Sequence, residues 1–201
     1  MNYKKGQLWM GKNKEDDEED DSKKCSVSVD RRRRFIYLFD AIKEESCLLV
    51  TKGLIDMDID MINKKQKDKQ QITLVIDSPG GYCCDGFAIA DILLNTICPT
   101  RSIATGEICS MAPLIYVCAD TRYITRNTWV MLHPISTSTG GDYIEFAKSR
   151  MENATKTEEM YDTLFLERTS IPRDIYFKAK QKELWLTAEE SIKYGIAHKI
   201  L

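Results

Sequence analysis

The chain has 201 residues, of which 43% are hydrophobic and 30% charged, and a formal net charge of −2 at pH 7. This length suits one domain with a substantial core and is short for two. The nearly balanced charge gives no electrostatic drive toward nucleic acid or an anionic membrane. No stretch approaches the roughly 18–20 apolar residues of a membrane helix, and the N-terminal sequence lacks the apolar core of a secretion signal. The sequence therefore predicts a cytoplasmic protein with neither nucleic acid nor membrane as a partner.

The first 33 residues differ in composition from the rest. Residues 12–24 are almost wholly charged, and four consecutive arginines follow at 31–34. Such a segment buries too little apolar surface to offset the entropy lost on ordering. We expect residues 1–33 to form a mobile N-terminal arm, either a solvated tail or a gating or docking segment, and residues 34–201 to form one folded domain.

The remaining sequence alternates between strand-like and helix-like segments. Short apolar runs rich in β-branched residues predict strands at 35–39, 47–51, 72–77, 101–105 and 128–132. Helices are predicted where a capping signal precedes a longer segment with a helical pattern. Three are expected to begin at Asp85, near Ser110 and at Pro172. Two more are expected from Asp142 to Glu167 and from Thr187 to a stop at Gly195. This alternation predicts an α/β fold with βαβ crossovers.

Ser110 precedes an apolar helical segment in which Pro113 is the informative residue. A proline is tolerated in the first turn of a helix, where its missing N–H costs nothing, so Pro113 places the helix start at about Ser110. Free N–H groups at a helix start favour a developing negative charge. A serine at a helix start is more often a simple cap, so this signal depends on its neighbours.

Two further segments give Ser110 a possible chemical role. Gly80 and Gly81 follow a predicted strand, and consecutive glycines allow a turn with exposed N–H groups that could stabilise an oxyanion. His133 ends another strand, and a hydroxyl nucleophile needs a neighbouring base, usually imidazole. A histidine at a strand end is often structural. The other histidine, His198, is the weaker candidate because it lies in the terminal segment.

Five segments together resemble the ClpP-type serine peptidases, the proteolytic subunits of the Clp ATP-dependent protease. They occur in the order of that family: Ile76–Gly81, Ala88–Asp91, Gly106–Ala112, Met131–Pro134 and Leu186–Ile196. The resemblance implies a ClpP/crotonase-like fold with βαβ repeats and a protruding helix-strand handle. It also implies Ser110 as nucleophile, His133 as base, and the backbone N–H groups of Gly81 and Met111 as the oxyanion hole.

The third member of the implied triad departs from the family. The family places an aspartate just before the Leu184–Glu189 stretch, where this chain has Glu183. A glutamate can orient imidazole as an aspartate does, although its longer side chain needs a different approach. Asp77 and Asp174 are weaker alternatives for the same role.

The resemblance further implies a ring-shaped homo-oligomer of stacked heptamers that degrades unfolded polypeptides supplied by an ATP-dependent unfoldase. The chain has no phosphate-binding loop of its own, so ATP hydrolysis would belong to that partner. Seven cysteines without a C-x-x-C pair, and only two histidines, do not fit a tetrahedral zinc site. We expect neither metal nor organic cofactor.

Three other functions stay open from the sequence. A catalytically silent ring subunit is the main alternative, because Glu183 departs from the family pattern. An acyl-CoA-handling enzyme of the crotonase group would share the fold but needs no serine nucleophile. Cys109 could replace Ser110 as nucleophile, but adjacent residues point in different directions, so both cannot face His133. The sequence does not decide between homomeric and mixed rings.

Overall fold

The computed structural model describes residues 26–63, 70–138 and 143–201. These residues form a mixed sheet of eight strands in the order β1-β2-β3-β4-β5-β8, with β6 paired to β4 and β7 paired to β6. The strands are β1 (Val27–Asp30), β2 (Phe35–Leu38), β3 (Ile72–Ser78), β4 (Thr100–Cys109), β5 (Thr121–Ile124), β6 (Trp129–Leu132), β7 (Leu184–Leu186) and β8 (Lys199–Ile200).

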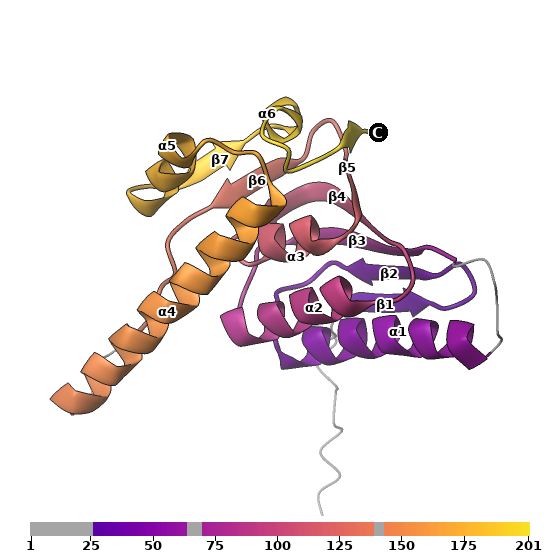
Figure 1. Ribbon diagram of the computed structural model, residues 1–201, viewed down its shortest axis with the longest axis horizontal. Coiled ribbons are helices and arrows are strands. Elements are labelled where there is room, and N and C mark those ends of the chain that lie inside the picture. The colour runs from indigo at the N-terminus through magenta and orange to yellow at the C-terminus, as the bar shows by residue number, and fades with distance from the viewer. Residues whose placement is uncertain (1–25, 64–69, 139–142) are drawn as a thin grey trace, which may run out of the picture.

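Six α-helices accompany the sheet in the described residues. They are α1 (Glu44–Asn63), α2 (Cys83–Asn95), α3 (Ala112–Cys118), α4 (Ile144–Arg168), α5 (Arg173–Tyr176) and α6 (Ala188–Lys193). A 3₁₀ turn at Phe177–Lys180 follows α5 directly. Helix α1 packs against α2, and α2 packs against α3 (Figure 1). None of the described helices contains an apolar stretch long enough to cross a membrane.

The centre of the sheet consists of parallel strands joined through helices. Strands β2, β3, β4 and β5 pair in parallel, and α1, α2 and α3 connect them in chain order. Strand β3 is buried along almost its whole length, as expected of a strand covered on both faces. The predicted α/β fold with βαβ crossovers is confirmed.

One predicted strand is wrong. Residues 47–51 were expected to be a strand, but they lie inside α1. The buried residues Val50, Leu54, Met57 and Met61 recur at spacings of three and four, which is the period of a helix with one buried face. A short apolar run such as 47–50 fits either element, and the longer repeat decides between them.

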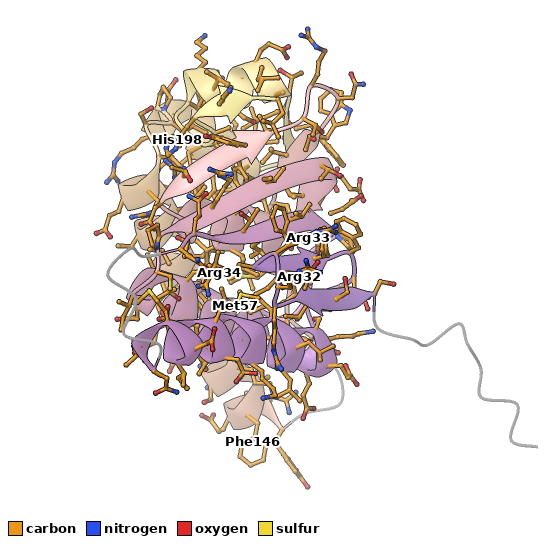
Figure 2. All side chains as sticks on the ribbon, turned by 90° about the vertical axis from the view of Figure 1, so that its right-hand side faces the viewer. Arg32, Arg33, Arg34, Met57, Phe146 and His198 are labelled. Atoms are coloured by element: carbon orange, nitrogen blue, oxygen red, sulfur yellow. The ribbon has the colours of Figure 1, made fainter. Side chains whose placement is uncertain are left out.

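Residues 27–30, predicted to lie in the N-terminal arm, are part of the sheet. Val27–Asp30 pair antiparallel with Phe35–Leu38, and the turn between them ends at Arg34, whose φ is 61°. The buried Arg34 guanidinium donates to the backbone oxygen of Met57 in α1 at 3.3 Å (Figure 2). The folded unit therefore begins before the predicted boundary at residue 33. Residues 1–25 of the predicted arm lie outside the described residues.

Helix α4 extends away from the rest of the fold (Figure 1). It forms the helix of the predicted handle, although the described residues 133–138 that lead to it form no strand. Its outer end carries exposed apolar side chains, among them Ile144 and Phe146, and Phe146 lies at the far end of the molecule in Figure 2. The predicted cap Asp142 lies outside the described residues, and Tyr143 occupies the N-cap position without a side-chain cap.

The predicted start and end of the last helix are confirmed. The Thr187 hydroxyl accepts from the Glu190 N–H at 3.2 Å, and the Glu190 carboxylate accepts from the Thr187 N–H at 2.8 Å, which completes a capping box. Gly195 follows the helix with a φ of 63°, a conformation that glycine adopts without strain. This well-capped helix follows directly after β7.

Candidate active site

Ser110 and His133 lie side by side because β4 and β6 are parallel neighbours. Their register pairs Cys109 with Met131, and the Ser110 N–H donates to the Met131 oxygen at 2.9 Å. Both side chains therefore emerge at the same edge of the sheet, just beyond the last paired residues. The His133 Nε2 and Ser110 Oγ atoms are 2.8 Å apart, a hydrogen-bond distance.

Ser110 occupies a sharp turn between β4 and α3. Its φ is 59°, a left-handed conformation that is uncommon for a residue with a side chain. The helix begins at Ala112 with Met111 as N-cap, so the predicted helix start at Ser110 is two residues too early. The prediction failed there because the left-handed residue redirects the chain before helical hydrogen bonding begins. Pro113 lies in the first turn, as expected.

Tyr161 fixes the turn from the other side. Its hydroxyl, on α4, donates to the Ser110 backbone oxygen at 2.8 Å. Burial, together with the carboxylate of Asp162, raises the pKa of Tyr161 far above its ordinary value, so the hydroxyl keeps its proton as a donor. The backbone N–H and C=O of Ser110 are thus both hydrogen-bonded, to β6 and to α4. Sequence reasoning missed Tyr161, because only its place on the long helix was visible.

The glycine turn after β3 lies directly against Ser110. Gly80 has a φ of 92°, and a Cβ built on it would stand 2.5 Å from the Ser110 Cβ and 2.6 Å from the Cys109 oxygen. Only glycine fits this position. The neighbouring Gly81 also meets backbone, that of Ile42, at the place where a Cβ would project. The predicted proximity of the glycine turn to Ser110 is therefore present in the structure.

The N–H groups of Gly81 and Met111 lie at this turn and at the start of α3. Neither donates a hydrogen bond to any part of the chain that the structure describes. Both residues, with Ser110 and His133, line a cavity of about 60 Å³. Two unpaired backbone donors on the wall of the cavity that holds the serine suit an oxyanion.

Glu183 lies near His133 in the sheet but bonds elsewhere. Strand β7 pairs antiparallel with β6, with Leu132 opposite Leu184, and one further step of this register sets Glu183 across from His133. The exposed Glu183 carboxylate accepts instead from Trp185 Nε1 at 2.9 Å. Within the described residues, His133 has no hydrogen bond to a carboxylate.

The alternative acids and the second histidine lie in other environments. Asp77 accepts the Glu107 N–H at 3.2 Å, and Asp174 is an exposed residue in the first turn of α5. His198 contacts Arg122, whose Nη2 is 2.6 Å from the His198 Nε2. Desolvation, followed by the charges of Arg122 and Arg168, lowers the pKa of His198. None of these three groups lines the cavity at Ser110.

Cys109 is buried at the end of β4. Burial raises the pKa of its thiol to about 11, with Glu107, Glu183 and Asp77 contributing further, so the thiol stays protonated at neutral pH. A protonated, buried thiol is a poor nucleophile. Among the described residues, no three His, Cys, Asp or Glu side chains gather as a metal-binding group.

Sequence comparison places this site in a known family. A family model described as Clp protease matches residues 19–201. The chain belongs to the Clp protease family. Among similar proteins is ATP-dependent Clp protease proteolytic subunit 1 of Chlamydia caviae, 31% identical over 137 residues, which cover 66% of this chain and 71% of the relative. The resemblance inferred from five short segments is confirmed.

Two other Clp protease relatives align over a larger share of the chain. ATP-dependent Clp protease proteolytic subunit 1 of Chlamydia muridarum is 27% identical over 178 residues, 86% of this chain and 88% of the relative. ATP-dependent Clp protease proteolytic subunit of Oenothera elata subsp. hookeri is 31% identical over 193 residues, 92% of this chain and 74% of the relative. These alignments extend well beyond the segments around Ser110 and His133, so the likeness concerns the whole fold.

Proposed function

We propose that this Clp protease family member is a serine endopeptidase subunit that hydrolyses peptide bonds of unfolded polypeptides. The observation that carries the proposal is the 2.8 Å contact between His133 Nε2 and Ser110 Oγ. Two groups that suit a base and a nucleophile share one cavity with two unpaired backbone donors. The names of the relatives, which are proteolytic subunits, support the same function.

The proposed chemistry needs only side chains and backbone of this chain. Ser110 Oγ attacks the peptide carbonyl carbon while its proton passes to His133 Nε2. The N–H groups of Gly81 and Met111 stabilise the negative charge that develops on the carbonyl oxygen. The C–N bond then breaks, and His133 gives its proton to the leaving amine. Water, deprotonated by His133, hydrolyses the acyl-enzyme and restores the Ser110 hydroxyl.

We assign Glu183 as the acid that orients His133. Its position across the extended β6–β7 register supports the assignment, since directly opposed residues in an antiparallel pair have Cβ atoms about 4.5–5.5 Å apart. The carboxylate would have to exchange the Trp185 indole for the His133 Nδ1–H. Glu183 is exposed, so a rotation of its side chain meets little steric resistance.

Assembly and partners extend the proposal. We propose a ring homo-oligomer of stacked heptamers, a cytoplasmic location, and substrates supplied by an ATP-dependent unfoldase. The printed names of the relatives support a subunit of an ATP-dependent protease. The exposed apolar side chains near the outer end of α4, Ile144, Phe146 and Met151, support burial against another subunit.

A fluorophosphonate probe and a short fluorogenic peptide test the proposed function. The assembled wild type is expected to react with the probe and to cleave the peptide. Ser110→Ala abolishes both, and His133→Ala reduces both by several orders of magnitude. Ser138→Ala, an exposed serine beyond His133, is the matched control and keeps full activity. An assembled wild type that neither reacts nor cleaves contradicts the proposal.

A catalytically silent ring subunit is the second candidate. The hydrogen bond between Trp185 and Glu183 favours it, because without an acid partner His133 lacks the group that fixes its tautomer. The same experiment separates the two functions. A silent subunit assembles into the same particle as an active one, and its Ser110 stays unlabelled.

A further inference from the structure

The cavity beside Ser110 is where the substrate side chain next to the scissile bond must lie, a consequence that rests on the proposed function. The side chain on the residue that supplies the attacked carbonyl is attached to the Cα atom that is bonded to that carbonyl carbon. It therefore enters the space that opens at Ser110. The wall of this space is formed by Gly81, Cys83, Ser110, Met111, His133, Pro134, Ile135, Ser136, Glu158, Tyr161 and Lys180.

An ion pair lies in the wall of this cavity. The Lys180 Nζ atom is 2.9 Å from Glu158 Oε1 and 2.7 Å from Asp162 Oδ1. The Tyr176 hydroxyl also donates to Asp162 Oδ1, at 2.6 Å, so two donors compensate Asp162. Glu158 and Lys180 line the cavity, whereas Asp162 does not. The side chains of Glu158 and Lys180 are 31% and 23% exposed, which leaves both groups accessible.

Each member of this pair has hydrogen-bonding capacity to spare. Glu158 uses Oε1 for both of its bonds, to Lys180 and to the Ile135 N–H at 3.2 Å. Its Oε2 has no partner within the part of the chain that the structure describes. An ammonium has three N–H donors, and Lys180 uses two of them. The two residues, which both line the cavity, thus keep one acceptor oxygen and one N–H outside these bonds.

A neutral group with both a donor and an acceptor matches this pair. A primary amide can donate to Glu158 and accept from Lys180. A basic side chain would be repelled by the Lys180 ammonium and would compete with it for Glu158, and an acidic one would be repelled by Glu158 and would compete with it for Lys180. An apolar side chain would remove water from both charged groups without replacing its hydrogen bonds, which is the costly case.

The size of the cavity agrees with an amide. Its volume of about 60 Å³ holds roughly four to six water-sized groups, at about 10–15 Å³ each. The side chains of Asn and Gln have about four and five non-hydrogen atoms. Phe, Tyr and Trp exceed this space. We propose that Glu158 and Lys180 make this chain cleave after Gln and Asn in preference to Leu or Met.

Fluorogenic peptides that differ only in the residue before the cleaved bond test this specificity on the full, assembled chain. With Gln, Asn, Leu, Met, Lys and Glu at that position, kcat/KM for Gln or Asn is expected to exceed that for Leu at least about tenfold. Lys180→Met and Glu158→Gln/Lys180→Met keep side-chain volume; the single variant removes the ammonium, and the double variant removes both charges of the pair. In both variants the preference shifts toward Leu and Met by about tenfold or more.

Lys178→Met is the matched control, since Lys178 is exposed on the same turn and does not line the cavity. It keeps the wild-type preference. Labelling of Ser110 by a small fluorophosphonate counts the folded, active sites in every variant, so poor folding is not mistaken for changed specificity.

Faster cleavage after Leu or Met than after Gln or Asn by the wild type overturns the specificity proposal. An unchanged profile in the Lys180 variants does the same. In both cases Ser110-dependent turnover shows that the proposed function still holds. If the wild type is neither labelled nor active, the proposed function fails, and the specificity proposal fails with it.

Discussion

The two sides of His133 are built in different ways. On the serine side, backbone fixes almost everything: the β4–β6 register, the bond from Ser110 N–H to Met131, and a glycine turn with no room for a side chain. On the other side, a continuation of the β6–β7 register would set Glu183 across from His133, but the exposed Glu183 side chain bonds to Trp185. Ser110, the proposed nucleophile, is held by main chain, and the contact of Glu183, the proposed acid, is set by a rotatable side chain.

The two sides of the site therefore tolerate substitution to different extents. A residue placed by its backbone keeps its location when nearby side chains are replaced. It loses that location when the backbone itself shifts. A contact that depends on the rotamer of an exposed side chain changes when neighbouring residues change. The energy cost is low, because exposed side chains change rotamer readily. The acid side is therefore the place where activity can be gained or lost by small changes.

Replacing Glu183 by Gln gives the largest expected effect and tests whether the acid side takes part at all. If Glu183 orients His133, the variant loses kcat on the order of 10⁴-fold, because the amide favours the wrong imidazole tautomer. Peptidase assays with Glu189→Gln, an exposed glutamate in α6, provide the control. Activity within about threefold of wild type would mean that His133 works without Glu183.

Replacing Gly80 by Ala tests how tightly the serine side is held. The new methyl group would displace the Ser110 Cβ or the Cys109 oxygen. The backbone φ of 92° at position 80 is also strained for alanine. We expect kcat/KM to fall about 10²–10³-fold, the size of losing one oxyanion donor. Gly53→Ala in α1 makes the same chemical change away from the site and is the control. Normal turnover by Gly80→Ala would show that the glycine turn does not restrain Ser110.

Replacing Tyr161 by Phe removes a single hydrogen bond from the serine side. Because one such bond contributes about 0.5–1.5 kcal/mol, we expect kcat/KM to fall about 3–10-fold with little change in thermal stability. Tyr143→Phe, at an exposed tyrosine before α4, serves for comparison. A loss as large as that of Gly80→Ala would mean that α4, and not the sheet, holds the nucleophile.

Replacing Trp185 by Phe has the smallest expected effect, and its direction is informative. The variant removes the indole N–H that holds Glu183 and leaves the carboxylate free for His133. We expect kcat to stay level or to rise about 2–5-fold, which is less than a full hydrogen bond to a charged group, because the exposed carboxylate is solvated with or without the indole. Trp129→Phe changes the ring that packs edge-on against Trp185, without touching Glu183. A clear loss of activity in Trp185→Phe alone would show that the indole holds Glu183 in its working position.

Sequence reasoning succeeded where local chemistry decides the structure. The strands around Ile76 and Leu132 and the capping box at Thr187 were expected on that ground, whereas the proximity of Ser110 and His133 was expected only from the family resemblance. It failed at residues 47–51, where a short apolar run fits helix and strand equally. The left-handed turn at Ser110 was missed because no local pattern marks it.

The residues that α4 and the following 3₁₀ turn place at the cavity could also not be predicted from the sequence. Tyr161, Glu158 and Lys180 reach the cavity because α4 packs against α3 and the 3₁₀ turn after α5 returns to α4. Glu158 and Lys180 are 22 positions apart and meet through tertiary packing. No periodicity or motif records such a contact. The rotamer of Glu183 was likewise unpredictable, since two partners lie within its reach.

The Tyr161 contact has a mechanical consequence. Helix α4 has 25 residues, a rod about 37 Å long, and Tyr161 lies seven residues from its inner end. The outer two thirds of the helix lie beyond this contact. A rotation of α4 about its inner end would therefore move the hydroxyl that holds the Ser110 carbonyl, and the main chain at Ser110 with it.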